Sequence, residues 1–186
     1  MKKIIIAASS IALSVMWSNQ ALASSISAGY QSMSISGVSG SFSGFGFGGN
    51  LDLNDNIFLG FSTSGVNATV SGEKLKLTSN TYSIGYKAAL SDNVEASVAL
   101  GRLSSTGAVG SYAHTQSTTV YGASLAVRPS DKVELGIGFV DATDSSYNID
   151  TVFTATYTLN EQIDLTAALS NASDSDSYTL GVRYNF

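Results

Sequence analysis

Residues 178–186 read Tyr178-Thr179-Leu180-Gly181-Val182-Arg183-Tyr184-Asn185-Phe186, and every second side chain in this stretch is large and apolar. The side chains between them are small, polar or charged. A period of two residues is typical of a β-strand whose two faces meet different surroundings. The same alternation recurs at residues 44–53, 82–90, 94–101, 133–139, 149–159 and 163–170. No segment after residue 23 keeps a helical period for long, so the sequence predicts an all-β fold.

Two kinds of connection separate these segments. The short polar turns are Asn54-Asp55-Asn56, Ser91-Asp92-Asn93, Pro129-Ser130-Asp131 and Asn160-Glu161-Gln162. Longer Ser- and Gly-rich loops are expected near 65–75, 104–117, 141–146 and 171–176. Alternating short and long connections are typical of an up-and-down membrane barrel with its short turns on the periplasmic side.

Four short turns, with both chain ends on the same side, predict five hairpins and therefore ten strands. The first hairpin, 24–53, is irregular and leaves eight strands as an alternative. There Ile26, Ala28 and Tyr30 keep one phase, whereas Met33 and Ile35 fall in the other. This shift of phase indicates a bulge or an early loop.

The sizes of the side chains indicate which face is outside. Large apolar residues occupy one face, and mainly Gly, Ser, Thr and Ala occupy the other, as the crowded interior of a narrow barrel requires. Charged residues are 12% of the chain, about half the usual share, whereas a soluble surface needs charge. Aromatic residues near the expected strand ends suggest two interfacial girdles: Tyr157, Tyr184 and Phe186 on the periplasmic side, and Tyr121, Phe139, Tyr147 and Tyr178 on the outer side. We expect an antiparallel transmembrane β-barrel, with a soluble lipocalin-like barrel as the alternative.

The first 23 residues have the features of a secretory signal peptide. Lys2 and Lys3 precede an apolar stretch at 4–17, and Ala21-Leu22-Ala23 ends the segment with small residues. The apolar stretch is short for a retained transmembrane helix. We therefore expect a cleaved signal peptide over residues 1–23 and one barrel domain over 24–186.

Charge and cysteine content exclude several functions for the mature chain. Without Lys2 and Lys3, seven basic residues face 14 acidic ones, a formal charge of −7, which argues against nucleic acid as a partner. The chain contains no cysteine, so disulfide bonds, thiol catalysis and thiolate metal sites are excluded.

The alternating strand 178–186, with its terminal aromatic residue, resembles the C-terminal signature of bacterial outer-membrane barrels. In that class the signature is recognised by the barrel assembly machinery, which implies an assembly signal here formed by Tyr178, Leu180, Val182, Tyr184 and Phe186. The mature chain resembles the small porin-superfamily barrels of the outer-membrane-protein-A, OmpX and opacity-protein type. This resemblance implies export through the periplasm to the outer membrane of a Gram-negative cell envelope. Ten strands would depart from the eight of those prototypes.

Seven charged side chains are expected to point inward near the periplasmic end of the barrel. They are Asp52, Lys87, Glu95, Arg128, Glu134, Asp164 and Arg183. Their signs alternate from strand to strand, as cross-strand pairing favours, and Arg183 is expected close to Asp52 where the barrel closes. Two interpretations stay open: a structural ion network, because buried charges normally come paired, and a constriction that selects solutes by charge. Above these residues the small polar wall predicts a water-filled pocket open to the outside.

Lys74, Lys76 and Arg102 are expected at the outer ends of two neighbouring strands, in phase with the lipid-facing side. Cations at this position predict contact with lipopolysaccharide phosphates, and solvated loop charges are the alternative.

The sequence predicts no catalytic residue, cofactor or metal ligand. His114, the one histidine, is expected to be exposed in the loop 104–117, where no partner for catalysis is evident. The aspartates of 141–150 and 171–176 lack the spacing of an EF-hand. Candidate functions are therefore a narrow porin-like channel for small solutes, a structural or surface barrel with a largely closed lumen, including adhesion or host and lipopolysaccharide interaction, and, less favoured, a barrel enzyme.

Overall fold

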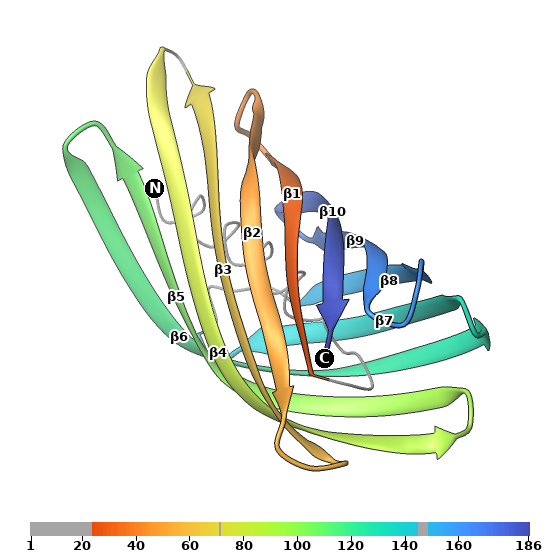
Figure 1. Ribbon diagram of the computed structural model, residues 1–186. Coiled ribbons are helices and arrows are strands. Elements are labelled where there is room, and N and C mark those ends of the chain that lie inside the picture. Colours follow the sequence, from red (N-terminus) through yellow and green to blue (C-terminus); the bar gives the residue numbers. More distant parts are fainter. Residues whose placement is uncertain (1–23, 71, 145–148) are drawn as a thin grey trace.

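A computed structural model of the chain, which describes residues 24–70, 72–144 and 149–186, is a closed antiparallel β-barrel (Figure 1). The strands are β1 (Ser25–Ile35), β2 (Ser41–Asp52), β3 (Ile57–Val70), β4 (Glu73–Ser91), β5 (Val94–Val109), β6 (Tyr112–Ser130), β7 (Val133–Ala142), β8 (Asp150–Thr158), β9 (Ile163–Ala172) and β10 (Ser175–Asn185). Each strand pairs with the next along the chain, and β1 pairs with β10 to close the barrel. Ten strands in the described residues confirm the preferred count, and the alternative of eight is wrong. The described residues contain no helix long and apolar enough to cross a membrane.

Two of the short turns at one end of the barrel, 54–56 and 160–162, are held by asparagine side chains. The Asn54 carboxamide oxygen accepts hydrogen bonds from the backbone N–H groups of Asn56 and Ile57, at 2.9 and 2.8 Å. Asn160 makes the same arrangement with Gln162 and Ile163, at 3.0 and 2.9 Å. These local hydrogen bonds favour a tight turn over continued strand. The signal peptide expected over 1–23 lies outside the described residues and stays a prediction.

Three of the four predicted long loops are largely strand. Residues 65–75 and 104–117 belong to the hairpins β3–β4 and β5–β6, and β9 and β10 leave only two residues between them near 171–176. The fourth, near 141–146, lies partly outside the described residues. Gly72, at φ +84°, and Gly110, at φ +56°, occupy the turns of the two long hairpins (Figure 1). Because Ser, Thr and Gly here fill both faces, the alternation fades, but the backbone hydrogen bonds continue.

The expected irregularity in the first hairpin is absent. β1 keeps an unbroken register with β10 from Ser25 to Ile35 and with β2 from Ser25 to Ser34. Met33 and Ile35 are 1% and 4% exposed, which places them inside the barrel. The prediction of a bulge was therefore wrong. The strand continues past the lipid, where water replaces hydrocarbon outside and apolar side chains are more stable on the inner face.

The same reversal of faces occurs on other strands and forms two apolar clusters inside the barrel. On β2, Phe45 faces outward, whereas Phe42 is fully buried inside the barrel. On β4, Tyr82 likewise faces outward, whereas Leu77 is buried inside. The first cluster, called here the β1–β4 cluster, contains Met33, Ile35, Phe42, Val66, Ala68, Leu75 and Leu77. The second, the β5–β9 cluster, contains Leu103, Val120, Val140, Val152 and Ala168. The expected wall of only Gly, Ser, Thr and Ala above the inward charges was therefore wrong.

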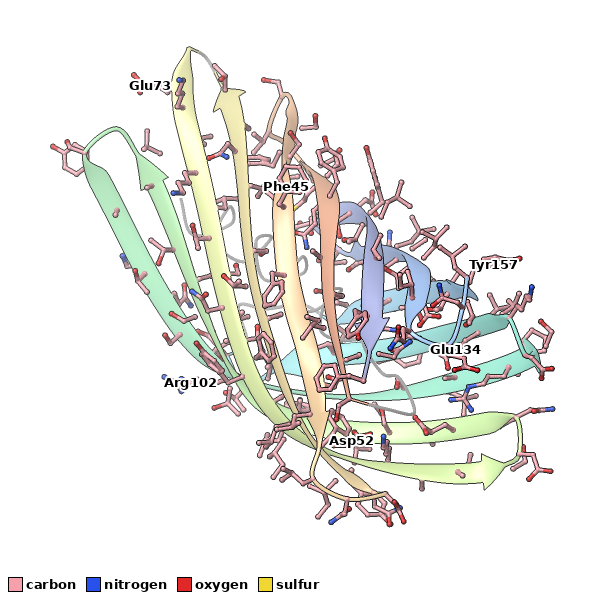
Figure 2. All side chains as sticks on the ribbon, in the orientation of Figure 1. Phe45, Asp52, Glu73, Arg102, Glu134 and Tyr157 are labelled. Atoms are coloured by element: carbon pink, nitrogen blue, oxygen red, sulfur yellow. The ribbon has the colours of Figure 1, made fainter. Side chains whose placement is uncertain are left out.

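Below this reversal the outer face of the barrel is a continuous apolar band. Its exposed side chains include Ile84, Val98, Leu135, Leu165 and Leu180. Aromatic residues lie at both margins, with Tyr82, Tyr121 and Phe139 on one side and Tyr157 and Tyr184 on the other. Figure 2 shows Glu73 at the tip of β4 and Asp52 at the opposite end of the barrel. Tyr147, expected in the outer girdle, lies outside the described residues.

Replacing Val98 with arginine is expected to lower the free energy of unfolding by about 2–4 kcal/mol, because Val98 faces outward within the apolar band, where a charge meets hydrocarbon. Chemical unfolding in phospholipid vesicles measures the change. Ser104→Arg, on the same face of β5 but beyond the band, is the matched control and should cost about 0–1 kcal/mol. Equal losses for the two variants would contradict the assignment of this band to lipid.

Candidate functional site

The inward charged residues gather at the end of the barrel that carries the short turns. We call them the ionic floor: Asp52, Lys87, Glu95, Arg128, Glu134, Asp164 and Arg183. They come from seven different strands, β2, β4, β5, β6, β7, β9 and β10, and each stands a few residues from a short turn or, for Arg183, from the end of β10. Lys87, Glu95, Asp164 and Arg183 are at most 6% exposed. Alternation within each strand turns these side chains inward, and their positions near the strand ends gather them at this end of the barrel.

The described residues form three ion pairs within this floor. Lys87 Nζ lies 2.6 Å from Asp52 Oδ2. Arg128 Nε donates to Glu134 Oε2 at 2.9 Å, between the neighbouring strands β6 and β7. Between β9 and β10, Arg183 Nε and Nη2 both lie within 2.9 Å of Asp164 Oδ2. Each pair places opposite charges together, so the cost of removing either ion from water is partly offset.

One of these partners differs from the expectation. Asp52 contacts Lys87 across β3 and not Arg183 across the closing seam. Phe58 of β3 stands opposite both Asp52 and Gly85, and its ring lies where a Cβ on Gly85 would be. The absence of a side chain at Gly85 therefore lets an inward aromatic ring pack beside the ion pair.

Two floor residues were not foreseen from the sequence. Asn185 Nδ2 donates to Asp164 Oδ2 at 2.7 Å, so this carboxylate receives an amide as well as a guanidinium. Asn185 shares the inward phase of Arg183, and this spacing could have indicated it. Phe58 is 4% exposed and points inward, although aromatic residues elsewhere in the band face lipid. No sequence signal distinguishes it from its outward neighbours except the alternation of β3.

Glu95 differs from the other acids of the floor. It is 5% exposed on β5 and belongs to none of the three ion pairs described above. Beside the Arg128–Glu134 and Arg183–Asp164 pairs lies a cavity of about 260 Å³, which Thr156 and Asn185 also line. The floor is thus a paired network with a small polar space on the β6–β10 side.

Above the floor, the lumen carries both hydroxyl groups and apolar clusters. The hydroxyl groups of Ser97 and Ser124 lie 2.8 Å apart near the floor. Further out on β5, Leu103 of the β5–β9 cluster comes before Ser105, whose hydroxyl lies 2.9 Å from that of Ser79. The β1–β4 cluster covers the inner wall of the first four strands. A solute crossing the barrel would meet an ionic layer and an apolar layer in turn.

The three outward cations do not form one group. Lys74 and Lys76 are exposed near the tip of β4, opposite Thr69 and Asn67 of β3. Arg102 stands opposite Tyr82, which lies six residues from Lys76 on β4, or about 20 Å along the strand. Figure 2 shows Arg102 projecting from the outer wall, well away from the tip at Glu73. The expectation that all three lie at the strand ends was wrong for Arg102, because β5 continues to Val109.

The remaining candidate residues are on the surface. His114 is exposed on β6, opposite Gly107, in a strand and not in the expected loop. Among residues 24–70, 72–144 and 149–186 no group of three or more His, Cys, Asp or Glu could hold a metal ion. The side chains of the predicted assembly signal alternate along the outer face of β10, and the Tyr184 and Phe186 rings stack with centroids 6.4 Å apart.

Comparison with known proteins gives a likeness of fold. No protein-family model matches the sequence, and the search of curated proteins finds no match. The KdgM porin in complex with disordered oligogalacturonate is similar to the chain with a TM-score of 0.50, 9% identity, and coverage of 88% of this chain and 99% of that one. The outer membrane protein OprG from Pseudomonas aeruginosa is similar with a TM-score of 0.47 and 12% identity, and the match covers 91% of this chain and 98% of OprG. Ail, the attachment invasion locus protein of Yersinia pestis, is similar with a TM-score of 0.39 and 17% identity, and the match covers 88% of this chain and 97% of Ail.

At these identities the likeness concerns the fold alone, and it agrees with the resemblance seen in the sequence. The closed ten-stranded order, the apolar outer band and the likeness to the KdgM porin lead to one conclusion. The chain has the fold of the small bacterial outer-membrane β-barrels, as an all-β, antiparallel, up-and-down transmembrane barrel.

Proposed function

We propose that this protein is an outer-membrane barrel closed to ions, which acts at the cell surface through its projecting strands. The observation that carries the proposal is the pair of barriers inside the lumen. The ionic floor contains three ion pairs, and the β1–β4 and β5–β9 clusters line the wall above it. An ion that passed the paired charges would next lose its hydration water against apolar side chains, and hydrophobic constrictions exclude ions by dewetting.

The long outer hairpins supply the surface for this function. β3–β4 and β5–β6 both continue past the apolar band. β3–β4 has a polar outer face and an apolar inner face, whereas the inner face of β5–β6 also carries polar residues such as Ser105 and Gln116. The β1–β4 cluster therefore gives the projecting part a core of its own, which holds it rigid above the membrane. Adhesion to a host or to surface glycans fits such a platform, with Lys74 and Lys76 available for anionic groups.

Single-channel recording in planar bilayers tests the closed state. We expect no steady conductance from the wild-type barrel, and none from a variant with both Arg128→Ala and Glu134→Ala, because the apolar clusters remain. Far-UV circular dichroism of both proteins confirms that the β-barrel is folded. Steady conductance from the wild-type protein would overturn the proposal.

A narrow porin-like channel for small solutes is the second candidate. The cavity of about 260 Å³ beside Arg128, Glu134, Asp164 and Arg183 favours it, because a polar space lined by both signs of charge is what a selective constriction needs. In this case the wild-type barrel conducts, and conductance rises when Arg128 and Glu134 are both replaced by alanine. The same recording therefore separates the two candidates.

The route to the membrane is part of the proposal. Residues 1–23 direct export to the periplasm, and the assembly machinery then recognises the outward side chains of β10. These side chains, Tyr178, Leu180, Val182, Tyr184 and Phe186, form one exposed row, which supports their accessibility to a partner. We assign no enzymatic activity to the barrel.

A further inference from the structure

We propose that the lipid-facing wall of β4, β5 and β6 carries a specific binding site for lipopolysaccharide, with an acyl chain in a groove and a lipid phosphate on Arg102. The proposal deepens the lipopolysaccharide contact suggested by the outward cations. It rests on the membrane-spanning fold, and it holds whether or not the lumen conducts.

The groove is an apolar hollow of about 570 Å³ in the outer wall. Outward side chains of three neighbouring strands border it: Ile84, Tyr86, Val98, Leu100 and Tyr121. These residues are about half exposed and lie within the apolar band. A hollow at this depth meets hydrocarbon tails and not water, so its natural occupant is an acyl chain.

The hollow has a reason in the sequence. Gly85, Ala99 and Gly122 stand in one row across β4, β5 and β6, and all three also line the groove. Ala123, which stands opposite Val98 on the outer face, adds no bulk. The side-chain positions of this row face the lumen, as that of Gly85 faces Phe58, so on the outer face only backbone lies between the larger outward side chains. A lipid tail packed there gains dispersion contacts that a flat wall would not offer.

A single cation stands at the outer end of this groove. Arg102 follows Val98 and Leu100 on the same face of β5, about 13 Å from Val98 along the strand. Its cross-strand partner is Tyr82, which is 67% exposed, as an aromatic residue at the membrane boundary should be. None of the ion pairs in the described residues includes Arg102. A guanidinium at this depth binds a phosphate by paired hydrogen bonds.

Charge at two heights favours lipopolysaccharide over a phospholipid. Arg102 lies at the boundary of the apolar band, and Lys76 and Lys74 lie about 20 Å or more further out on the polar face of β4. A phospholipid carries its phosphate at one level only. A glycolipid with phosphates at the boundary and anionic sugars above it complements both levels.

The test measures binding of purified diphosphoryl lipid A to the detergent-solubilised barrel, by native mass spectrometry with titration. Arg102→Gln removes the cation, and Val98→Trp fills the groove; each is expected to weaken binding by about tenfold or more. Lys132→Gln removes a positive charge at the opposite end of the barrel, and Leu165→Trp adds the same bulk on β9. These two matched controls should bind lipid A as the wild type does.

Three results would overturn the proposal. They are wild-type affinity in both Arg102→Gln and Val98→Trp, equal weakening in the two controls, and binding of phosphatidylglycerol as tight as that of lipid A. Far-UV circular dichroism verifies the fold of each variant, and Arg102→Gln, an exposed polar change, keeps the test valid if Val98→Trp fails to assemble. The closed lumen is tested separately by conductance, so a negative result for lipid A binding would overturn the lipid site without overturning the closed-lumen proposal.

Discussion

Replacing Asp164 with alanine is expected to destabilise the barrel by about 3–5 kcal/mol. Asp164 is 1% exposed and accepts hydrogen bonds from Arg183 and Asn185. Without the carboxylate, the guanidinium of Arg183, itself 5% exposed, stays buried in a membrane-spanning strand without the charge of its ion-pair partner. Urea unfolding in phospholipid vesicles, monitored by far-UV circular dichroism, measures the loss of unfolding free energy.

The double variant with Asp164→Leu and Arg183→Met separates the charge from the packing. Replacing both members of a buried pair with apolar residues of similar size is often neutral or stabilising. We therefore expect the double variant to recover most of the stability lost in Asp164→Ala. If the double variant were as unstable as the single one, the ion pair would not be the reason for the loss.

Replacing Phe42 with alanine is expected to cost about 3–5 kcal/mol, although the residue lies beyond the membrane. Phe42 is 0% exposed within the β1–β4 cluster and stands opposite Met33 on β1. Removing its ring opens a cavity in the inner packing of the projecting hairpins. Equilibrium unfolding of the wild-type protein and the variant in the same vesicles gives the difference.

Phe45 provides the matched control on the same strand. It is 72% exposed on the outer face, where its ring lies edge-on to Tyr30 with centroids 5.8 Å apart. Lipid tails can occupy the space that Phe45→Ala leaves, so we expect a loss of about 0.5–1.5 kcal/mol, the value of an aromatic pair. Losses of similar size for the two phenylalanines would contradict the reversal of faces between residues 45 and 42.

The sequence predicted the class of fold, the ten strands of the described chain and the orientation of most side chains. A bilayer imposes one rule on every spanning strand: apolar residues face out, small and polar ones face in, and the sheet must close. This rule is local and has a period of two, so it can be read from each segment alone. The sequence also predicted the ion pairs Arg128–Glu134 and Asp164–Arg183, because each joins neighbouring strands next to a short turn.

Outside the bilayer the same rule misled the interpretation. Met33 and Ile35 suggested a bulge, and residues 104–117 suggested a loop, but both belong to regular strands. The physical cause is the change of solvent: past the membrane boundary, water outside reverses the preference of each face. A sequence shows the change of phase but not the height at which it occurs.

What only the tertiary structure decided is which residues far apart in the chain share a height. The register of ten tilted strands brings Asp52 to Lys87 across β3, with Phe58 packed over Gly85 beside this ion pair. It also separates Arg102 from Lys74 and Lys76 and sets Arg102 above an apolar groove. Residues 178–186 indicate a membrane barrel by themselves, because alternation is a property of one strand. Which residues are neighbours across strands depends on how all ten strands are aligned, and no single segment carries that information.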